Sequence, residues 1–294
     1  MGIRVCCRKG RPGATRIMSD SFTVSRALAA SGLVPFEAKV LLAHVLGRDR
    51  AWLAAHSGDA ISGEQAKTFE ALARRRRDGE PVAYLVGRRE FYGLDLEITR
   101  DVLIPRPETE LLVDLALARL PGDRHARVLD LGTGSGAVAL AIASARRTAQ
   151  VVASDISSAA LALAQRNAAR LGIGNVSFLA SDWFAALTDQ RFDLIVANPP
   201  YVAAGDPHLD QGDLRHEPAP ALGAGGDGLS AIRAIVATAP AHLARGGWLL
   251  LEHGHDQSDR VGALLRDGGF ADVRTARDLA GMPRVSYGRY SAEG

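Results

Sequence analysis

The sequence predicts an α/β protein in which a mostly parallel sheet carries helices on both faces. A small helical domain precedes the sheet and is joined to it by a β-hairpin. Three observations predict this fold. From residue 127 onward, short apolar runs typical of buried strands alternate with segments of helical periodicity. Residues 19–87 have helical periodicity and no convincing strand, and residues 88–105 contain an alternating stretch typical of a hairpin.

Length, charge and cysteine content limit the possible classes of protein. The 294 residues suffice for two domains, and the net charge of +2 argues against non-specific nucleic-acid binding as the main activity. No apolar run approaches the roughly 18 residues that a membrane span needs. Cys6 and Cys7 both lie in the N-terminal tail, which excludes a disulfide framework or a cysteine metal site for the fold. A reducing, cytoplasmic location fits best.

Residues 1–18 form a basic tail without an acidic residue. The tail lacks the apolar segment of a secretory signal, and Cys6 occupies the position where a myristoylation motif requires Ser or Thr. A basic, acid-poor composition is also typical of a transit peptide, which is the alternative. We expect a disordered extension ahead of an alternative start at Met18.

The first domain, residues 19–87, is expected to consist of helices. Its predicted helices are Ser25–Ala30, Phe36–Leu46 after Pro35, and a third that Ser62 and Gln65 begin as a capping box and that ends in Arg74–Arg77. Four arginines suit the negative end of a helix dipole, so a solvated helix terminus is expected. A contact with ribosomal RNA or an acidic partner is the alternative, and the domain carries no catalytic constellation.

Residues 88–105 are predicted to form a β-hairpin linker. Leu94, Leu96 and Ile98 alternate after Gly93, as in a half-buried strand that follows a turn. Pro107 then suits the start of a helix, Glu108–Leu120.

Residues 106–294 are predicted to form the sheet domain, in which strands and helices alternate. The predicted strands are Arg127–Leu131, Gln150–Ser154, Val176–Ala180, Phe192–Ala197, Gly247–Glu252, Ala271–Arg277 and Val285–Tyr290. The predicted helices are Gly136–Ala145, Ala159–Leu171, Leu229–Ala244 and Asp256–Arg266. Such sheets bind ligands beyond the carboxyl ends of their strands, at the topological switch point, so the functional residues should follow strands.

A glycine loop follows the first predicted strand of the sheet. Gly132, Thr133, Gly134, Ser135 and Gly136 are candidate cofactor contacts, because glycines let a ligand approach the backbone and a helix N-terminus offers unpaired N–H groups. The spacing also fits a dinucleotide-binding loop, with Ala137 at its last position. The tighter Gly-x-Gly-x-Gly spacing favours S-adenosylmethionine, as does Asp130, whose carboxylate is placed to meet the ammonium group of that ligand.

Two further strand ends carry candidate cofactor residues. Asp155 ends the second strand, where a carboxylate would hold both ribose hydroxyls, and the alternative is a helix N-cap. Trp183 follows the third strand and would pack on the adenine face while Asp182 takes an adenine or ribose hydrogen. For Trp183 the alternative is ordinary core filling.

The stretch Asn198-Pro199-Pro200-Tyr201 is the candidate catalytic and substrate-binding site. The two prolines have no N–H for a sheet ladder and would hold a rigid corner after the fourth strand. The Asn198 amide oxygen, the carbonyl groups of the prolines and the ring of Tyr201 suit the binding of a planar NH2 group. The alternative is a Pro-rich turn that ends a strand.

These motifs resemble those of class I S-adenosylmethionine-dependent methyltransferases that modify amide or exocyclic nitrogen. Additional stretches resemble the release-factor glutamine methyltransferases, the PrmC/HemK family, and the resemblance covers the chain from Ser19 to Tyr290. These stretches are Phe91-Tyr92-Gly93, Leu103-Ile104-Pro105-Arg106-Pro107-Glu108-Thr109-Glu110, Ser181-Asp182-Trp183-Phe184 and Gly212-Asp213-Leu214-Arg215-His216-Glu217-Pro218.

The resemblance implies a Rossmann-like methyltransferase domain that uses S-adenosyl-L-methionine, and a helical domain that recognises the substrate. It implies methylation of the N5 amide nitrogen of the glutamine in the Gly-Gly-Gln motif of peptide chain release factors. Asn198 and the Pro199 carbonyl would accept the two amide hydrogens, Tyr201 would stack on the amide, and Asn198 would also border the cofactor. We expect a monomer, no nucleic-acid substrate and no membrane association.

Three alternatives remain open at this point. In the first alternative, the substrate is a glutamine of a ribosomal protein. In the second, it is an adenine or guanine amino group of DNA or ribosomal RNA, because enzymes that methylate these groups also use Asn-Pro-Pro-aromatic to hold an NH2 group. A nucleotide-binding module without catalysis is the third alternative.

Among the remaining residues, Arg106 and Glu108 are candidates for a loop that closes over the cofactor, and Ala203–Gly228 for the substrate entrance. We expect no metal site, because His253 and His255 lack further ligands at suitable spacing.

Overall fold

The computed structural model describes residues 22–120, 122, 125–203, 205, 212–218, 223 and 225–291. The predicted N-terminal tail and parts of the predicted entrance loop Ala203–Gly228 lie outside the described residues. The chain divides into two compact units, residues 1–78 and 79–294.

The first unit consists of helices. They are α1 (Val24–Ala30), α2 (Pro35–Leu46), α3 (Arg50–Ala55) and α4 (Gly63–Arg77). The predicted capping box of α4 is confirmed, since the Ser62 hydroxyl accepts from the Gln65 N–H and the Gln65 side chain accepts from the Ser62 N–H. Helix α3 was not predicted, because six residues are too few to establish a helical period.

The arginines that end α4 make contacts within the first unit. Arg76 forms an ion pair with Glu37 of α2, with 2.9 Å between Nη2 and Oε1, and only 19% of its side chain is exposed. Arg77 pairs with Glu70 at 2.7 Å and also donates to the Ser31 carbonyl. The prediction of a solvated terminus is therefore wrong for Arg76, whereas Arg77 is exposed; the two arginines join α4 to α2 and to the end of α1.

The second unit begins with the short helix α5 (Val82–Val86) and the predicted hairpin, β1 (Arg88–Phe91) and β2 (Leu94–Glu97). Tyr92 and Gly93 form its turn with φ angles of 51° and 75°, as the two-residue type I′ turn requires. The 3₁₀ helix η1 (Pro107–Thr109) and α6 (Glu110–Leu117) follow, where one helix was predicted. A further 3₁₀ turn, η3, covers Leu214–His216.

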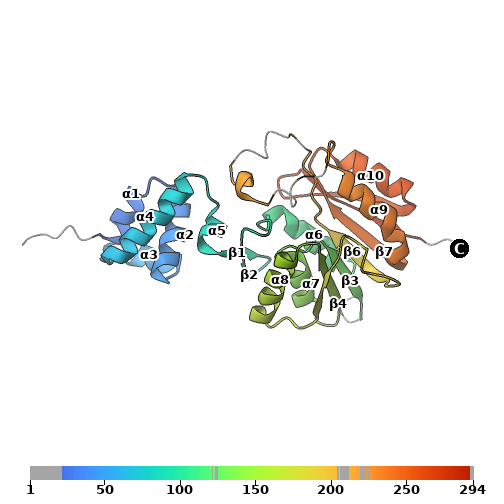
Figure 1. Ribbon diagram of the computed structural model, residues 1–294, viewed down its shortest axis with the longest axis horizontal. Helices are drawn as coiled ribbons and strands as arrows, with labels where there is room; N and C mark the ends of the chain where they lie inside the picture. The colour runs from blue at the N-terminus through green and yellow to red at the C-terminus, as the bar shows by residue number, and fades with distance from the viewer. Residues whose placement is uncertain are drawn as a thin grey trace, which may run out of the picture. The chain divides into compact units, whose positions relative to one another are not determined.

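A seven-stranded sheet forms the centre of the second unit (Figure 1). Its strands in the order of the sheet are β5 (Val176–Ala180), β4 (Gln150–Asp155), β3 (Arg127–Leu131), β6 (Phe192–Ala197), β7 (Leu243–Glu252), β9 (Pro283–Tyr290) and β8 (Phe270–Arg277). The first five are parallel to one another, whereas β9 is antiparallel to both β7 and β8. The predicted mostly parallel sheet is thus confirmed.

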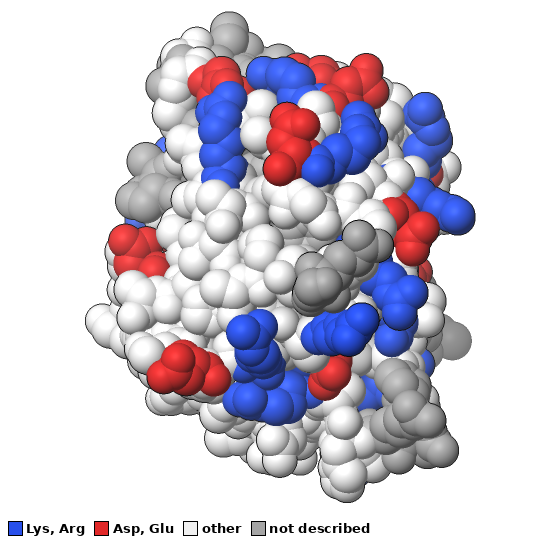
Figure 2. All heavy atoms as spheres, turned by 90° about the vertical axis from the view of Figure 1, so that its right-hand side faces the viewer, with Lys and Arg blue, Asp and Glu red and all other residues white. Residues whose placement is uncertain are grey.

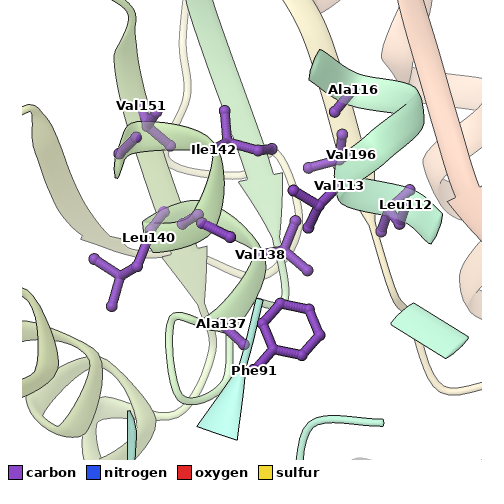
Figure 3. Packing of buried hydrophobic residues seen from close by; sticks show 14 of the residues in the cluster. Phe91, Leu112, Val113, Ala116, Ala137, Val138, Leu140, Ile142, Val151 and Val196 are labelled. Atoms are coloured by element: carbon purple, nitrogen blue, oxygen red, sulfur yellow. The ribbon is translucent and has the colours of Figure 1, made fainter. Parts of the chain in front are cut away.

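Helices cover both faces of the sheet, as alternation along the strands requires. Val128 and Val196 belong to the apolar cluster that contains α6, α7 (Ala137–Ala145) and α8 (Ser158–Leu171). Their chain neighbours Leu129 and Ile195 belong to the opposite cluster, with α9 (Ser230–His242) and α10 (Ser258–Asp267). Figure 3 shows the first cluster, in which Phe91 of the hairpin lies beside Ala137 and Val138 at the start of α7.

The predicted boundaries of α9 and β7, where the helix gives way to the strand, are wrong. The helix predicted to end at Ala244 ends at His242, and β7 begins at Leu243 rather than at Gly247. The pairing of β7 with β6 is irregular here, because Phe192 pairs with Leu243 while Leu194 pairs with Trp248. Gly246, with a φ of 78°, permits the extra residues of this bulge.

Candidate active site

The order of the strands places a cavity at the centre of the sheet. Strands β3 and β6 are neighbours, but the chain runs from β3 outward to β4 and β5 before it returns to β6. The loops after β3 and β6 therefore separate at a topological switch point. A cavity of about 470 Å³ lies there, within the size range of small-molecule sites. Its walls come from the ends of β3 to β6, from residues 101–109 and from Pro218.

The glycine loop after β3 forms one wall of the cavity. Gly132, Thr133, Gly134 and Ser135 line it, and their contact with a cofactor stays a prediction. Gly136 is not among the described residues that line the cavity. Its φ is 84°, and an added Cβ would lie 3.1 Å from the Ala164 Cβ. Glycine at this position lets α7 begin close against α8.

Asp130 is a buried carboxyl group at the end of β3. It lines the cavity, and its side chain accepts hydrogen bonds from the Thr133 hydroxyl at 2.6 Å and the Ala139 N–H at 3.2 Å. Burial raises its pKa to about 7, and these two hydrogen bonds only partly oppose that effect. The group therefore titrates near neutral pH.

Asp155 holds the glycine loop in place from the end of β4. Its Oδ2 accepts from the Gly134 N–H at 2.8 Å and its Oδ1 from the Ser157 N–H at 2.9 Å. The alternative that Asp155 caps α8 is wrong, because the Ser157 hydroxyl accepts the N-cap hydrogen bond from Ala160. The Asp155 carboxylate lines the cavity, and each oxygen retains a second lone pair for a ligand.

Two large apolar residues that follow the ends of β5 and β4, Trp183 and Ile156, also line the cavity. Trp183 lines it and also packs against the apolar cluster beneath the sheet, so lining and core filling both apply. Ile156 lines it as well, with 72% of the residue exposed. The sequence reasoning missed Ile156, although a large apolar residue directly after a strand-end carboxylate was the available signal. Asp182 is a further lining residue.

The predicted catalytic stretch follows β6, on the other side of the switch point. Asn198 and Pro200 line the cavity, and Pro199 is buried. The Tyr201 hydroxyl donates to Glu252 Oε1 at 3.3 Å, and its main-chain carbonyl accepts from Gln257 at 2.9 Å. The predicted stacking of Tyr201 on a substrate amide stays a prediction.

Two polar residues that the sequence reasoning did not select adjoin this stretch. Thr109, 4% exposed, accepts from the Asn198 side-chain N–H at 3.3 Å. Glu252, 1% exposed, ends β7 beside Tyr201. Burial raises the pKa of Glu252 to about 7, against the lowering effects of Thr109, Arg284 and Tyr201. In the sequence, Thr109 stands out only as part of a motif, and Glu252 only as the last residue of a predicted strand.

Arg106 and Glu108 do not line the cavity. Arg106 instead forms an ion pair with Glu217, whose side chain is completely buried. Glu217 also accepts from the Ile104 N–H at 3.2 Å, so it joins residues 212–218 to the wall of the cavity formed by residues 101–109. A closing loop at Arg106 stays a prediction.

His253 is a buried structural histidine, as expected. Its Nδ1 donates to the Gly254 carbonyl and its Nε2 accepts from the Ser286 hydroxyl, both at 2.8 Å. Burial lowers the pKa of His253, which favours the neutral ring that these two hydrogen bonds require. His255 is exposed. Within the described ranges, no group of three or more His, Cys, Asp or Glu side chains is arranged to hold a metal ion.

Surface charge on the face in Figure 2 is mixed. Lys and Arg side chains alternate with Asp and Glu, with uncharged surface between them. This mixture accords with the net charge of +2. Among the described residues, no helix is both long and apolar enough to cross a membrane.

Comparisons with known proteins identify relatives along most of the chain. The family model described as "PrmC N-terminal domain" matches residues 23–87, and "Methyltransferase small domain" matches residues 108–214. A release factor glutamine methyltransferase of Xylella fastidiosa is 52% identical over 90% of this chain and 96% of its own length. A protein of the same name from Bordetella pertussis is 53% identical over 89% and 97% of the two chains.

A solved structure agrees with the fold. The 16S rRNA N2 G1207 methyltransferase of Thermus thermophilus, in complex with AdoMet and guanosine, superposes with a TM-score of 0.51. The match covers 69% of this chain and 49% of that protein at 24% identity, so it bears on the fold alone.

Proposed function

The chain belongs to the family of release factor glutamine methyltransferases, and from this membership we propose its reaction. It transfers a methyl group from S-adenosylmethionine to the N5 amide nitrogen of the glutamine in the Gly-Gly-Gln motif of a peptide chain release factor. One observation carries the proposal beyond the family name: Asn198 lines the same cavity as the glycine loop. A group that can bind an amide therefore borders a site that can hold the methyl donor.

The cavity suits S-adenosylmethionine, which supplies an electrophilic methyl group. The buried Asp130 carboxyl group would meet the ammonium group, and Asp155 would hold the ribose hydroxyls. Trp183 and Ile156 offer apolar surface to the adenine ring. The backbone at Gly134 is open to a ligand, because an added Cβ would meet no heavy atom within 4 Å.

The residues after β6 would activate an unreactive nucleophile by positioning it. An amide nitrogen shares its lone pair with the carbonyl group, so it attacks only when that lone pair is directed at the methyl carbon. The Asn198 oxygen and the Pro199 carbonyl would accept its two hydrogens and orient the nitrogen. These acceptors also stabilise the positive charge that develops on the amide nitrogen during methyl transfer. The methylated nitrogen then loses a proton to water.

The helical first unit is proposed to recognise the release factor; its described helices α1 to α4 lie between residues 24 and 77. A release factor acts in translation, so the proposal places the enzyme in the cytoplasm. We propose a monomer, with no nucleic-acid substrate.

Methylation of a defined peptide tests the proposal. The purified protein is incubated with S-adenosylmethionine and an unmethylated release factor, and peptide mass spectrometry determines where a methyl group is added. We expect one methyl group on the Gly-Gly-Gln glutamine, and none with Asn198→Ala. Methylation of a ribosomal protein, RNA or DNA in place of the release factor would contradict the proposed substrate.

A further inference from the structure

Asn198, Thr109 and Glu252 form a chain of polar contacts behind the cavity. The Asn198 Nδ2 lies 3.3 Å from the Thr109 Oγ1, and the Thr109 hydroxyl in turn favours the ionised form of the Glu252 carboxyl group. Tyr201 donates to Oε1 of the same carboxyl group. Asn198 and Thr109 line the cavity, but Glu252 does not, so Glu252 can act on a ligand only through its neighbours.

The sheet register explains why these residues meet. Ala197 at the end of β6 pairs with Leu251 of the parallel strand β7, so Asn198 and Glu252 are the next residues at the same edge. Thr109 ends the 3₁₀ turn η1, which precedes α6, and α6 packs against β6 and β7. Thr109, a motif residue without an assigned role, thus lies between the ends of β6 and β7.

The number of hydroxyl hydrogens determines the direction of the contacts. Thr109 has one hydroxyl hydrogen, and an ionised carboxylate can only accept. When Thr109 donates that hydrogen to ionised Glu252, its oxygen can only accept from Asn198. The amide of Asn198 must then direct its NH2 group toward Thr109 and its carbonyl oxygen away from Thr109.

We propose that Thr109 and Glu252 are positioning residues that hold the Asn198 amide with its oxygen available to the substrate NH2 group. The inference rests on the proposed function, which it deepens by assigning the orientation of the catalytic amide. A side-chain amide rotated by 180° would offer its own NH2 group to the substrate NH2 group, and two donors do not bind each other.

The charge of Glu252 decides between these two orientations. A protonated Glu252 can donate to Thr109, which then donates to the Asn198 oxygen and reverses the amide. Arg284 of β9 and Glu108 of η1 are the charged side chains that act on Glu252, the first favouring and the second opposing ionisation, and Tyr201 donates to it. With a Glu252 pKa of about 7, both states are populated near neutral pH.

The buried second oxygen of Glu252 makes the ionisation of this carboxyl group sensitive to its few hydrogen-bond donors. Within the described part of the chain, Oε2 has no hydrogen-bond partner. An ionised carboxylate with one unpartnered oxygen costs more than a fully paired one, so the ionised state depends on the Tyr201 hydroxyl at Oε1 and on the Thr109 hydroxyl. Removal of the Thr109 hydroxyl should therefore disturb both the amide and the carboxylate.

Two substitutions at Thr109 test the inference through kinetics at saturating S-adenosylmethionine. Thr109→Val keeps the shape and removes the hydroxyl, so we expect kcat for release-factor methylation to fall roughly tenfold. Thr109→Ser retains the hydroxyl and should restore most of kcat. Calorimetry should give the same cofactor Kd for both variants within about threefold. Equal loss of kcat in both variants, or none in either, would overturn the inference.

A second measurement does not depend on the substrate. With ¹⁵N-labelled asparagine, the side-chain amide resonances of Asn198 are identified as those that Asn198→Ala removes. We expect one of the two amide hydrogens to exchange slowly in the unsubstituted protein and in Thr109→Ser, and both to exchange fast in Thr109→Val. Unchanged exchange in Thr109→Val would refute the inference even if the substrate proves to be another molecule.

The pH profile isolates Glu252. In the unsubstituted protein, kcat at saturating cofactor should rise with pH through about 7 as Glu252 ionises. Glu252→Gln can both donate and accept, so we expect a lower kcat that is independent of pH in this range. If kcat of Glu252→Gln still changes with pH near 7, another group titrates there and Glu252 does not position Asn198. Failure of the proposed function would appear differently, as an unmethylated release factor with the unsubstituted protein.

Discussion

Asp130 combines complete burial with a position at the cofactor cavity. Its pKa of about 7 means that roughly half of the molecules carry a neutral Asp130 at neutral pH when no ligand is bound. An ammonium group beside it would favour the ionised form, so the bound cofactor and a proton compete for the same carboxyl group.

Cofactor affinity should therefore depend on pH. Because the pKa of Asp130 is raised, the carboxylate that attracts an ammonium group is scarce below pH 7 and becomes abundant above it. We expect the Kd for S-adenosylmethionine to fall as pH rises from about 5.5 to 7, by up to roughly tenfold per pH unit. Isothermal titration calorimetry at several pH values measures this dependence.

Asp130→Asn provides the matched control. Both hydrogen bonds of Asp130 end on Oδ2, and an amide oxygen can accept them in its place. The variant should fold, bind the cofactor more weakly and show no pH dependence over the same range. An unchanged slope in Asp130→Asn would show that another group titrates.

Single residues also show where sequence reasoning was limited. The spacing of glycines and strand ends identified Asp130, Asp155 and Asn198 as neighbours of one cavity, because parallel strands end at one edge. It did not separate Gly136, which serves helix packing, from the glycines that line the cavity. Thr109 was missed as well, because only tertiary packing brings it to Asn198.

At the scale of elements, the buried side chain of Asn167 is one of several that join the hairpin to the sheet domain. Asn167 of α8 is fully buried; its oxygen accepts from the Glu97 N–H at 2.7 Å, and its NH2 group donates to the Glu97 and Ser135 carbonyls at 3.0 Å. Asn167 therefore joins β2, α8 and the glycine loop. An exposed ion pair between Arg166 and Glu97 accompanies this contact at 2.9 Å.

Removal of Asn167 should cost more stability than removal of the ion pair. Asn167→Ala leaves buried main-chain groups without partners, so we expect a loss of about 2–4 kcal/mol in the free energy of unfolding. Arg166→Ala removes an exposed pair and should cost less than about 1 kcal/mol. Urea unfolding followed by circular dichroism measures both values. Equal losses in the two variants would show that the buried hydrogen bonds contribute little.

Strands of the parallel sheet and helices with a clear cap were predictable, whereas two short helices were not. The bounds of β3, β5 and β6 agree with the predicted ranges to the residue, because strands of a parallel sheet are short apolar runs between turn residues. Helices α3 and α5 cover six and five residues, which is less than two turns, and their sequences contain no repeated apolar face. The start of β7 was missed because a bulge is a property of strand pairing.

At the scale of the whole molecule, the two units differ in what they contribute. Among the residues that the structure describes, those that line the cavity lie between Asp101 and Pro218, within the second unit. No described residue of the first unit is among them, and that unit consists of helices. Cofactor binding should thus depend on the second unit alone, whereas recognition of a large substrate need not.

A fragment of residues 79–294 tests this division. We expect it to bind S-adenosylmethionine within about threefold of the full chain and to methylate a short Gly-Gly-Gln peptide at a similar rate. For the intact release factor, kcat/KM should fall at least roughly tenfold, because the proposed recognition unit is missing. Circular dichroism first establishes that the fragment is folded. Equal kcat/KM values for the two proteins on the intact factor would assign recognition to residues 79–294.

The position of the cavity residues along the chain also has a consequence for the order of synthesis. A ribosome adds residues from the N-terminus, so the segment that ends at Pro218 is made before β7, β8 and β9. The four strands β3 to β6 are consecutive in that segment and are neighbours in the sheet. Glu252 and Arg284 follow later. During translation of this chain, the described residues that line the cavity are therefore all synthesised before Glu252, which is proposed to position Asn198, and before Arg284, which acts on Glu252.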